Sequence, residues 1–277
     1  NTDGGFGYGL EPDYWNPHSS PSQTYEATEI IWEIGMERED ADHPVIQGIL
    51  EYLSSGKEFE DNSWAHTIDT NNNYPHADWW HYPYASWWED TPANRFATDY
   101  NPTAGLAGFL YFEDPDTDFY DLAKEVATEA INQFLMIKDC KEMYVVACFC
   151  RLYDYIAEAG LEAEFPMEAF EKRLKEVVFQ TITQDVNLYI TMWDVNICRP
   201  STFLRAKDSM YYEMNKNIAE FELEFIAKTQ LGDGSWEVTW EWGKSYPAAW
   251  GVAKNWWKSK IAIQNLLYWS GMMDSEE

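Results

Sequence analysis

Apolar residues recur at intervals of three and four along most of the chain, the spacing that places them on one face of a helix. Proline or glycine punctuates several of these segments, as at Pro44, Gly35 and Gly56, where helices are expected to begin or end. Only residues 186–193 are predicted to form an extended segment. The pattern predicts an all-α protein, with helices over residues 24–35, 43–56, 101–112, 118 or 121 to 137, 143–159, 166–180, 208–230 and 253–269.

Short motifs repeat along the chain. One series combines an acid, two variable residues and an aromatic residue, at 3–6, 61–64 and 233–236, with 116–119 near an intermediate position. A second series places proline, which is favoured at the first position of a helix, at residues 21, 102, 200 and 247. Together the two series predict helix pairs that repeat about every 40 to 60 residues. One repeat is enlarged by an insertion at residues 61–100.

The segment Gln230-Leu-Gly-Asp-Gly-Ser-Trp236 resembles the glutamine–tryptophan repeat of squalene–hopene cyclases and related terpenoid cyclases, in which Gln and Trp tie helix pairs together. Residues 3–6 resemble a degenerate copy, and Tyr246-Pro-Ala-Ala-Trp250 with Trp256-Trp257 resembles the family's C-terminal repeat. The resemblance implies an α/α-toroid, a barrel of repeated helix pairs that protein prenyltransferases share. We expect a single domain over residues 1–277, with the insertion at the cavity mouth and the toroid incomplete at its N-terminus.

The aromatic content is high, with 15 Trp, 18 Tyr and 14 Phe making up 17% of the chain. Rings of this size must line something broader than a core of Leu and Val. The composition therefore predicts either a cavity or an unusual core.

The net charge of -29 would repel nucleic acids and anionic lipid surfaces, so neither is an expected partner. No apolar run approaches the roughly 20 residues of a membrane span, and the first residues have no signal-peptide character. The four cysteines do not follow zinc-knuckle spacing and are expected to be free thiols. These features are typical of a cytoplasmic protein.

The catalytic motifs of the resembled families are incomplete in this chain. Cyclases that begin by protonation use Asp-x-Asp-Asp, whereas residues 114–118 lack the adjacent acids and are expected to cap a helix. No Asp-Asp-x-x-Asp magnesium motif is present. Prenyltransferases hold zinc with Asp, Cys and His, which Asp194 and Cys198 resemble only with a different spacing. The sequence therefore assigns no metal site and leaves the cofactor unknown.

The insertion contains the densest group of chemically active residues. Histidine and aspartate together supply general acids, general bases or metal ligands, and tryptophan rings bind sugars, isoprenoid chains or cations. The equally weighted alternative is a structured lid whose histidines bond backbone carbonyls. The group comprises His66, Asp69, His76, Asp78, Trp79, Trp80, His81, Trp87 and Trp88.

Other loops expected at the same mouth are residues 9–18 and 193–199, together with 240–242 before the last inner helix. They contribute acids and rings that include His18 and Asn196. The predicted catalytic residues are Asp194, His76, Asp78 and Asp13. The predicted substrate-binding residues are Glu11, Trp15, Trp79, Trp80, Arg199, Trp240 and Trp242.

Three functions follow from these features. The first is a prenyltransferase- or terpenoid-cyclase-like protein with an aromatic cavity for a small hydrophobic ligand. The second is a carbohydrate-active α/α-barrel enzyme that uses paired carboxylates on a sugar-like ligand. The third is a non-catalytic binding scaffold. We expect the first, and the sequence leaves the substrate and the reaction open.

Overall fold

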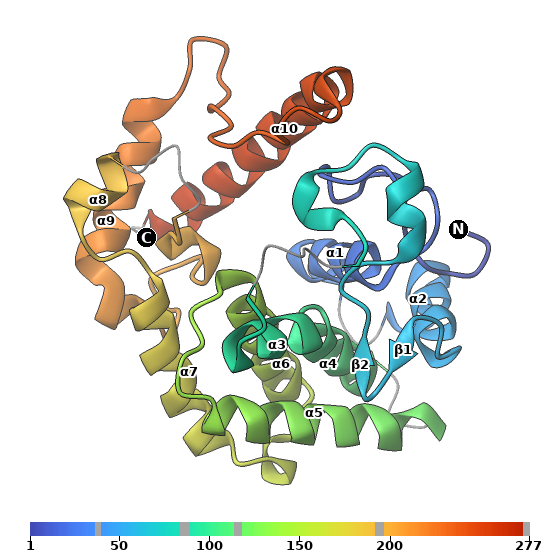
Figure 1. The fold of residues 1–277 in the computed structure, drawn as a ribbon. Helices are drawn as coiled ribbons and strands as arrows, with labels where there is room; N and C mark the ends of the chain where they lie inside the picture. The colour runs from blue at the N-terminus through green and yellow to red at the C-terminus, as the bar shows by residue number, and fades with distance from the viewer. Residues whose placement is uncertain (37–39, 84–88, 114–117, 192–196, 274–277) are drawn as a thin grey trace. The chain divides into compact units, whose positions relative to one another are not determined.

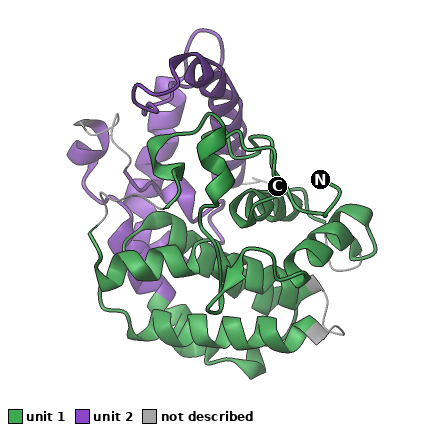
Figure 2. Ribbon diagram, turned by 45° about the vertical axis from the view of Figure 1, so that its right-hand side comes forward, with its two compact units in different colours: residues 1–173 green, residues 174–277 purple. Residues whose placement is uncertain are grey.

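The computed structural model describes residues 1–36, 40–83, 89–113, 118–191 and 197–273. These residues are mostly helical, which confirms the predicted all-α class, and the expected toroid stays a prediction. The chain forms two compact units, unit 1 over residues 1–173 and unit 2 over residues 174–277 (Figure 2). Asp194, Asn196, Trp87, Trp88 and residues 114–117 lie outside the described residues.

Most helices begin and end close to their predicted positions (Figure 1). Unit 1 contains α1 (Pro21–Glu33), α2 (Pro44–Ser54), α3 (Pro92–Tyr100), α4 (Thr103–Glu113), α5 (Asp118–Met136) and α6 (Met143–Glu158). Helix α7 (Met167–Thr181) crosses the boundary between the units. Unit 2 contains α8 (Val186–Thr191), α9 (Tyr212–Thr229) and α10 (Pro247–Met272), and a 3₁₀ turn, η5 (Pro200–Thr202).

Caps explain where the helices begin. Pro21 opens α1, and the Gln23 N–H donates to the Ser20 Oγ at 3.2 Å. Helix α6 has no proline, and the carboxylate of Glu142 accepts the Val145 N–H at 2.8 Å instead. Each cap satisfies a backbone donor that lacks a partner within its own helix.

The core of unit 1 is built around α4, which packs against α5 and α6. A Cβ at Gly105 would lie 2.3 Å from the ring of Tyr25, so glycine permits the close approach of α4 to α1. Buried phenylalanine rings fill the neighbouring space: Phe134 lies 4.4 Å from Phe149 and 5.7 Å from Phe170. Part of the aromatic surplus therefore forms a close-packed core.

The prediction of an extended segment at residues 186–193 is wrong, because residues 186–191 form α8. The alternation of Val186, Leu188 and Ile190 with polar residues and Tyr189 suggested a strand, but all three aliphatic side chains are exposed. Asp185 favours the helix, since its Oδ1 accepts the Asn187 N–H at 2.8 Å. Helix α3, inside the insertion, was not predicted.

The acid-x-x-aromatic loops have two different geometries. Residues 61–64 belong to a hairpin in which β1 (Phe59–Glu60) pairs with β2 (Ser63–Trp64), and Asp61 and Asn62 have φ of 50° and 60°. Residues 3–6 and 233–236 instead form turns in which the aspartate Oδ1 accepts the N–H two residues later, at 3.3 and 3.0 Å. Similar sequence patterns therefore specify different local structures.

The glutamine–tryptophan segment closes the end of α9. The Gln230 side chain donates to the Gly234 carbonyl at 2.9 Å, and the buried Trp236 ring donates through Nε1 to the Ile226 carbonyl at 2.9 Å. Trp236 thereby satisfies a carbonyl in the last turn of a helix. This segment has a structural role in unit 2.

Candidate functional site

Two segments from distant parts of the sequence lie together in unit 1. Tyr14 and His76 form an antiparallel bridge, the Trp15 N–H donates to the Pro75 carbonyl at 2.9 Å, and the Ala77 N–H donates to the Asp13 carbonyl at 2.8 Å. We call residues 11–16 and 66–81 the loop cluster. It contains the predicted residues Glu11, Asp13, Trp15, His76, Asp78, Trp79 and Trp80.

Asparagine side chains hold the two segments in register. Asn16 Nδ2 donates to Asn71 Oδ1 at 2.8 Å, and Asn71 Nδ2 donates to the Trp80 carbonyl at 3.1 Å. Both asparagines are buried. They fix the short 3₁₀ helix η3 (Asp78–Trp80), which carries two of the predicted rings.

Trp80 lies at the centre of a stack of rings. Its ring is 4.4 Å from that of Tyr14 and 5.0 Å from that of His66, to which it is nearly parallel. Tyr14 is fully buried, its hydroxyl lies 2.7 Å from the Ser20 Oγ, and burial raises its pKa well above the ordinary value. Trp15 and Trp79, which belong to the same loop cluster, are half-buried.

Two carboxylates of the loop cluster are buried, with Glu11 7% and Asp13 4% exposed. The Asp13 N–H donates to Glu11 Oε1 at 3.4 Å, and the Glu11 N–H donates to Gln23 Oε1 at 2.9 Å. Gln23 also donates to the Tyr14 carbonyl at 3.0 Å, so α1 positions this segment. Asp78, in contrast, is exposed.

His66 and His76 each contact a backbone carbonyl, the kind of contact that the lid interpretation expects. His66 Nδ1 lies 3.0 Å from the Asn101 carbonyl, and burial lowers the pKa of His66 to about 4. His76 Nδ1 lies 2.7 Å from the Tyr74 carbonyl, and its Nε2 lies 3.1 Å from Nδ1 of His81. These contacts orient the imidazole rings and do not prevent them from acting as acids or bases.

An ion-pair group that was not predicted from the sequence joins α1 to α6. Arg151 donates to both carboxylate oxygens of Glu29 at 2.8 and 3.0 Å and to Asp154 at 3.1 Å. Its guanidinium lies 4.5 Å from the centre of the Trp32 ring. A single arginine in an otherwise apolar stretch of α6 was the signal for this group. The bidentate pairing ties the two helices together.

A buried carboxylate in unit 2 was also missed. Glu222 is fully buried on α9, where it accepts the Ser201 N–H at 2.8 Å and the Ser201 hydroxyl at 2.7 Å. Burial raises the pKa of Glu222, and the bonds from Ser201 and the charge of Arg199 oppose that rise. The sequence signal for this carboxylate was the position of Glu222, four residues from both Ile218 and Ile226, which places it on the same buried face of the helix.

The other predicted residues of unit 2 lie apart from the loop cluster in sequence. Arg199 is half-buried, and its positive charge acts to lower the pKa of Glu222. Trp240 packs edge-on against Trp257 at 4.8 Å, and Trp242, 1% exposed, lies 5.8 Å from Trp250. The burial of Trp242 favours a packing role for that residue. Asp194, a predicted catalytic residue, lies outside the described residues.

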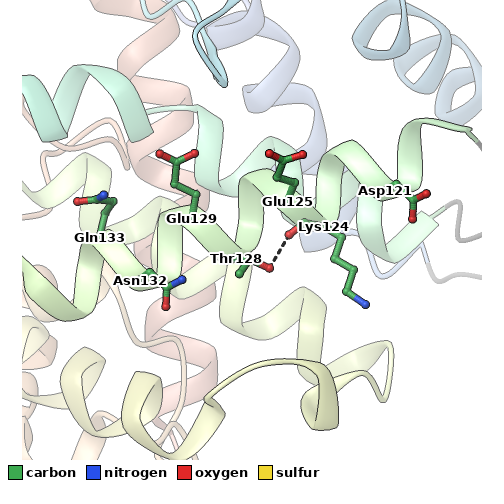
Figure 3. A pocket seen from close by; sticks show the side chains of 7 residues that line it. All are labelled: Asp121, Lys124, Glu125, Thr128, Glu129, Asn132 and Gln133. Carbon is green, nitrogen blue, oxygen red and sulfur yellow. Dashed lines mark hydrogen bonds between the residues drawn. The ribbon is translucent and has the colours of Figure 1, made fainter.

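A shallow hollow on α5 contains none of the predicted residues (Figure 3). Its seven lining side chains all come from one helix, and Thr128 donates to the Lys124 carbonyl of the same helix at 2.7 Å. Such a surface has no opposing wall to enclose a ligand. The hollow is the exposed face of a helix: Asp121, Lys124, Glu125, Thr128, Glu129, Asn132 and Gln133.

Comparison with known proteins gives no match to a family model, a curated protein or a solved structure. Within the described residues, no group of three or more His, Cys, Asp or Glu side chains is arranged to hold a metal ion. Cys198 is buried, and its thiol lies 3.9 Å from the Arg199 carbonyl. None of the helices in the described ranges has the length and apolar character needed to cross a membrane.

Proposed function

We propose that the protein is a prenyltransferase- or terpenoid-cyclase-like enzyme whose small, largely hydrocarbon ligand lies against the loop cluster of unit 1. The observation that supports this proposal is the bridge between Tyr14 and His76. It gathers ring, carboxylate and imidazole groups from two distant segments on one rigid backbone. The glutamine–tryptophan segment adds support from the resemblance.

The chemistry of the loop cluster suits an unsaturated hydrocarbon. The faces of tryptophan and tyrosine rings carry negative electrostatic potential, so they attract cations and stack on planar groups. Buried carboxylates and oriented imidazoles move protons more effectively where water is excluded. Trp15 and Trp79 supply the half-buried faces, while the stack around Trp80 supplies rigidity.

Tryptophan fluorescence tests this proposal during titration with farnesol and with farnesyl diphosphate. We expect saturable quenching in the wild type and at least about tenfold weaker binding in Trp79→Ala. The matched control is Trp256→Ala, which removes a 42% exposed tryptophan from α10 in unit 2 and should bind as the wild type does. Absence of saturable binding of either probe by the wild type would refute the proposal.

The buried pair Glu11 and Asp13 favours a second candidate, a carbohydrate-active enzyme. Glycosidases use two carboxylates, one as general acid and the other as base or nucleophile. Incubation with cello- and malto-oligosaccharides, followed by product analysis, separates the candidates. Release of sugars by the wild type and its loss in Glu11→Gln would support the second candidate. Isoprenoid binding without turnover would instead support a binding scaffold.

A further inference from the structure

His76 and His81 form a hydrogen-bonded pair at one edge of the loop cluster. Nε2 of His76 lies 3.1 Å from Nδ1 of His81, and the ring centres are 5.3 Å apart. His76 is 5% exposed, whereas His81, which directly follows η3, is exposed. The pair therefore joins the buried part of the loop cluster to its accessible edge.

A backbone contact determines where the protons lie. Nδ1 of His76 is 2.7 Å from the Tyr74 carbonyl, which can only accept a hydrogen bond, so this nitrogen carries a proton. Nε2 of neutral His76 then has a lone pair, and it accepts the Nδ1–H of His81. Neutral His81 consequently keeps its lone pair on Nε2, and within the described ranges no residue hydrogen-bonds that atom.

We propose that His81 is the proton acceptor of the loop cluster and that His76 is the residue that positions it. Nε2 of His81 takes a proton from the bound ligand, and His76 holds the His81 ring in the Nδ1–H tautomer. The inference rests on the proposed function, since it needs a ligand at the loop cluster. The reactive nitrogen is therefore on His81, and the buried His76 affects the reaction only by positioning His81.

The step balances without a cofactor or a redox partner. A C–H or O–H bond of the ligand breaks, and its electron pair stays with the ligand. A new N–H bond forms on Nε2, and the His81 imidazolium later returns the proton to water. Trp79 and Trp80 directly precede His81 in the chain, and both belong to η3.

His43 provides an internal reference of the opposite tautomer. It is exposed like His81, but its Nδ1 accepts the Val45 N–H at 3.3 Å at the start of α2, so its proton lies on Nε2. Spectra of nitrogen-15-labelled imidazoles near pH 8, where an ordinary imidazole is neutral, distinguish the tautomers. We expect the lone pair on Nε2 in His81 and on Nδ1 in His43. A proton on Nε2 of His81 in the wild type would overturn the inference.

Two substitutions of His76 separate positioning from folding. In His76→Asn the side-chain amide still donates toward the Tyr74 carbonyl, but nothing accepts the Nδ1–H of His81. In His76→Gln an amide oxygen takes the place of Nε2 and accepts that proton. We expect His81 to lose its single tautomer in the Asn variant and to keep it in the Gln variant. An unchanged His81 signal in a folded Asn variant would contradict the positioning role.

Reactivity is tested with 5-nitrobenzisoxazole, a flat aromatic probe. A base removes its ring C–H proton, the N–O bond breaks, and a coloured cyanophenolate forms. We expect His81→Ala to lower the rate at least about tenfold and His43→Ala to leave it unchanged. Equal rates in wild type and His81→Ala, or a wild-type rate no higher than that of free imidazole, would overturn the inference. Failure of farnesol and farnesyl diphosphate to bind, with the His81 effect intact, would refute only the proposed function.

Discussion

The depressed pKa of His66 predicts a specific loss of stability in acid. The folded protein holds this imidazole neutral down to a pKa of about 4, because the ring is buried against Trp80, whereas an unfolded histidine titrates near 6.5. Between these two values the unfolded state binds more protons than the folded state. The contribution of His66 to the free energy of unfolding therefore falls as the pH falls from 6.5 to 4.

The size of the effect follows from the two pKa values. Linkage gives a loss of about 2 kcal/mol between pH 7 and pH 5 that is attributable to His66 alone. His66→Asn removes the titration, while its amide can still donate to the Asn101 carbonyl that His66 Nδ1 contacts. The variant should therefore be less stable than the wild type at pH 7, because it loses the ring stack, and it should lose about 2 kcal/mol less on acidification.

Urea denaturation at pH 7 and at pH 5, followed by tryptophan fluorescence, measures this difference. All other titratable groups are shared, so their contributions cancel in the comparison. His18→Asn, which removes an exposed imidazole, controls for the loss of one histidine. The same pH dependence in wild type and His66→Asn would refute the reasoning.

Three further predictions concern groups that tie helices together, each measured by urea denaturation at pH 7. Arg151→Met should lower the free energy of unfolding by about 2 kcal/mol, because it leaves the partly buried Glu29 carboxylate without its bidentate partner. A loss near zero would show that the pair adds no stability. Glu222→Leu removes the acceptor of the Ser201 N–H and should lower the free energy of unfolding by about 2 kcal/mol. Glu222→Gln retains an acceptor and should lower it by less than about 1 kcal/mol. Equal losses in the two variants would contradict this role of Glu222. Trp236→Phe should cost about 1 kcal/mol through the lost Nε1 hydrogen bond, and an unchanged midpoint would show that the glutamine–tryptophan segment does not stabilise unit 2.

The sequence was most informative where local signals determine structure. Helices α1, α2 and α6 begin at a proline or beside a capping side chain, and both signals can be read from a few neighbouring residues. The prediction failed at residues 186–193, where alternating aliphatic residues resemble a strand but a capping aspartate favours a helix. Helix α3 was missed because its nine residues lie inside an aromatic, turn-rich insertion.

The candidate site was predictable in its residue types but not in its contacts. The sequence shows that the insertion is rich in His, Asp and Trp. It also shows the acids Glu11 and Asp13. The bridge between Tyr14 and His76 was not, because it depends on tertiary packing between segments that carry no strand signal. The tautomer of His81 depends in turn on a carbonyl at Tyr74 and on the ring of His76, which no local pattern reports.

The proposed function places the ligand at the loop cluster of unit 1. Photo-crosslinking with a benzophenone-bearing farnesyl analogue, followed by peptide mass spectrometry, tests it most directly. We predict labelling within residues 11–16 and 66–81 that excess farnesol suppresses. Suppressible labelling confined to other segments, such as the exposed face of α5 or α10, would contradict the claim.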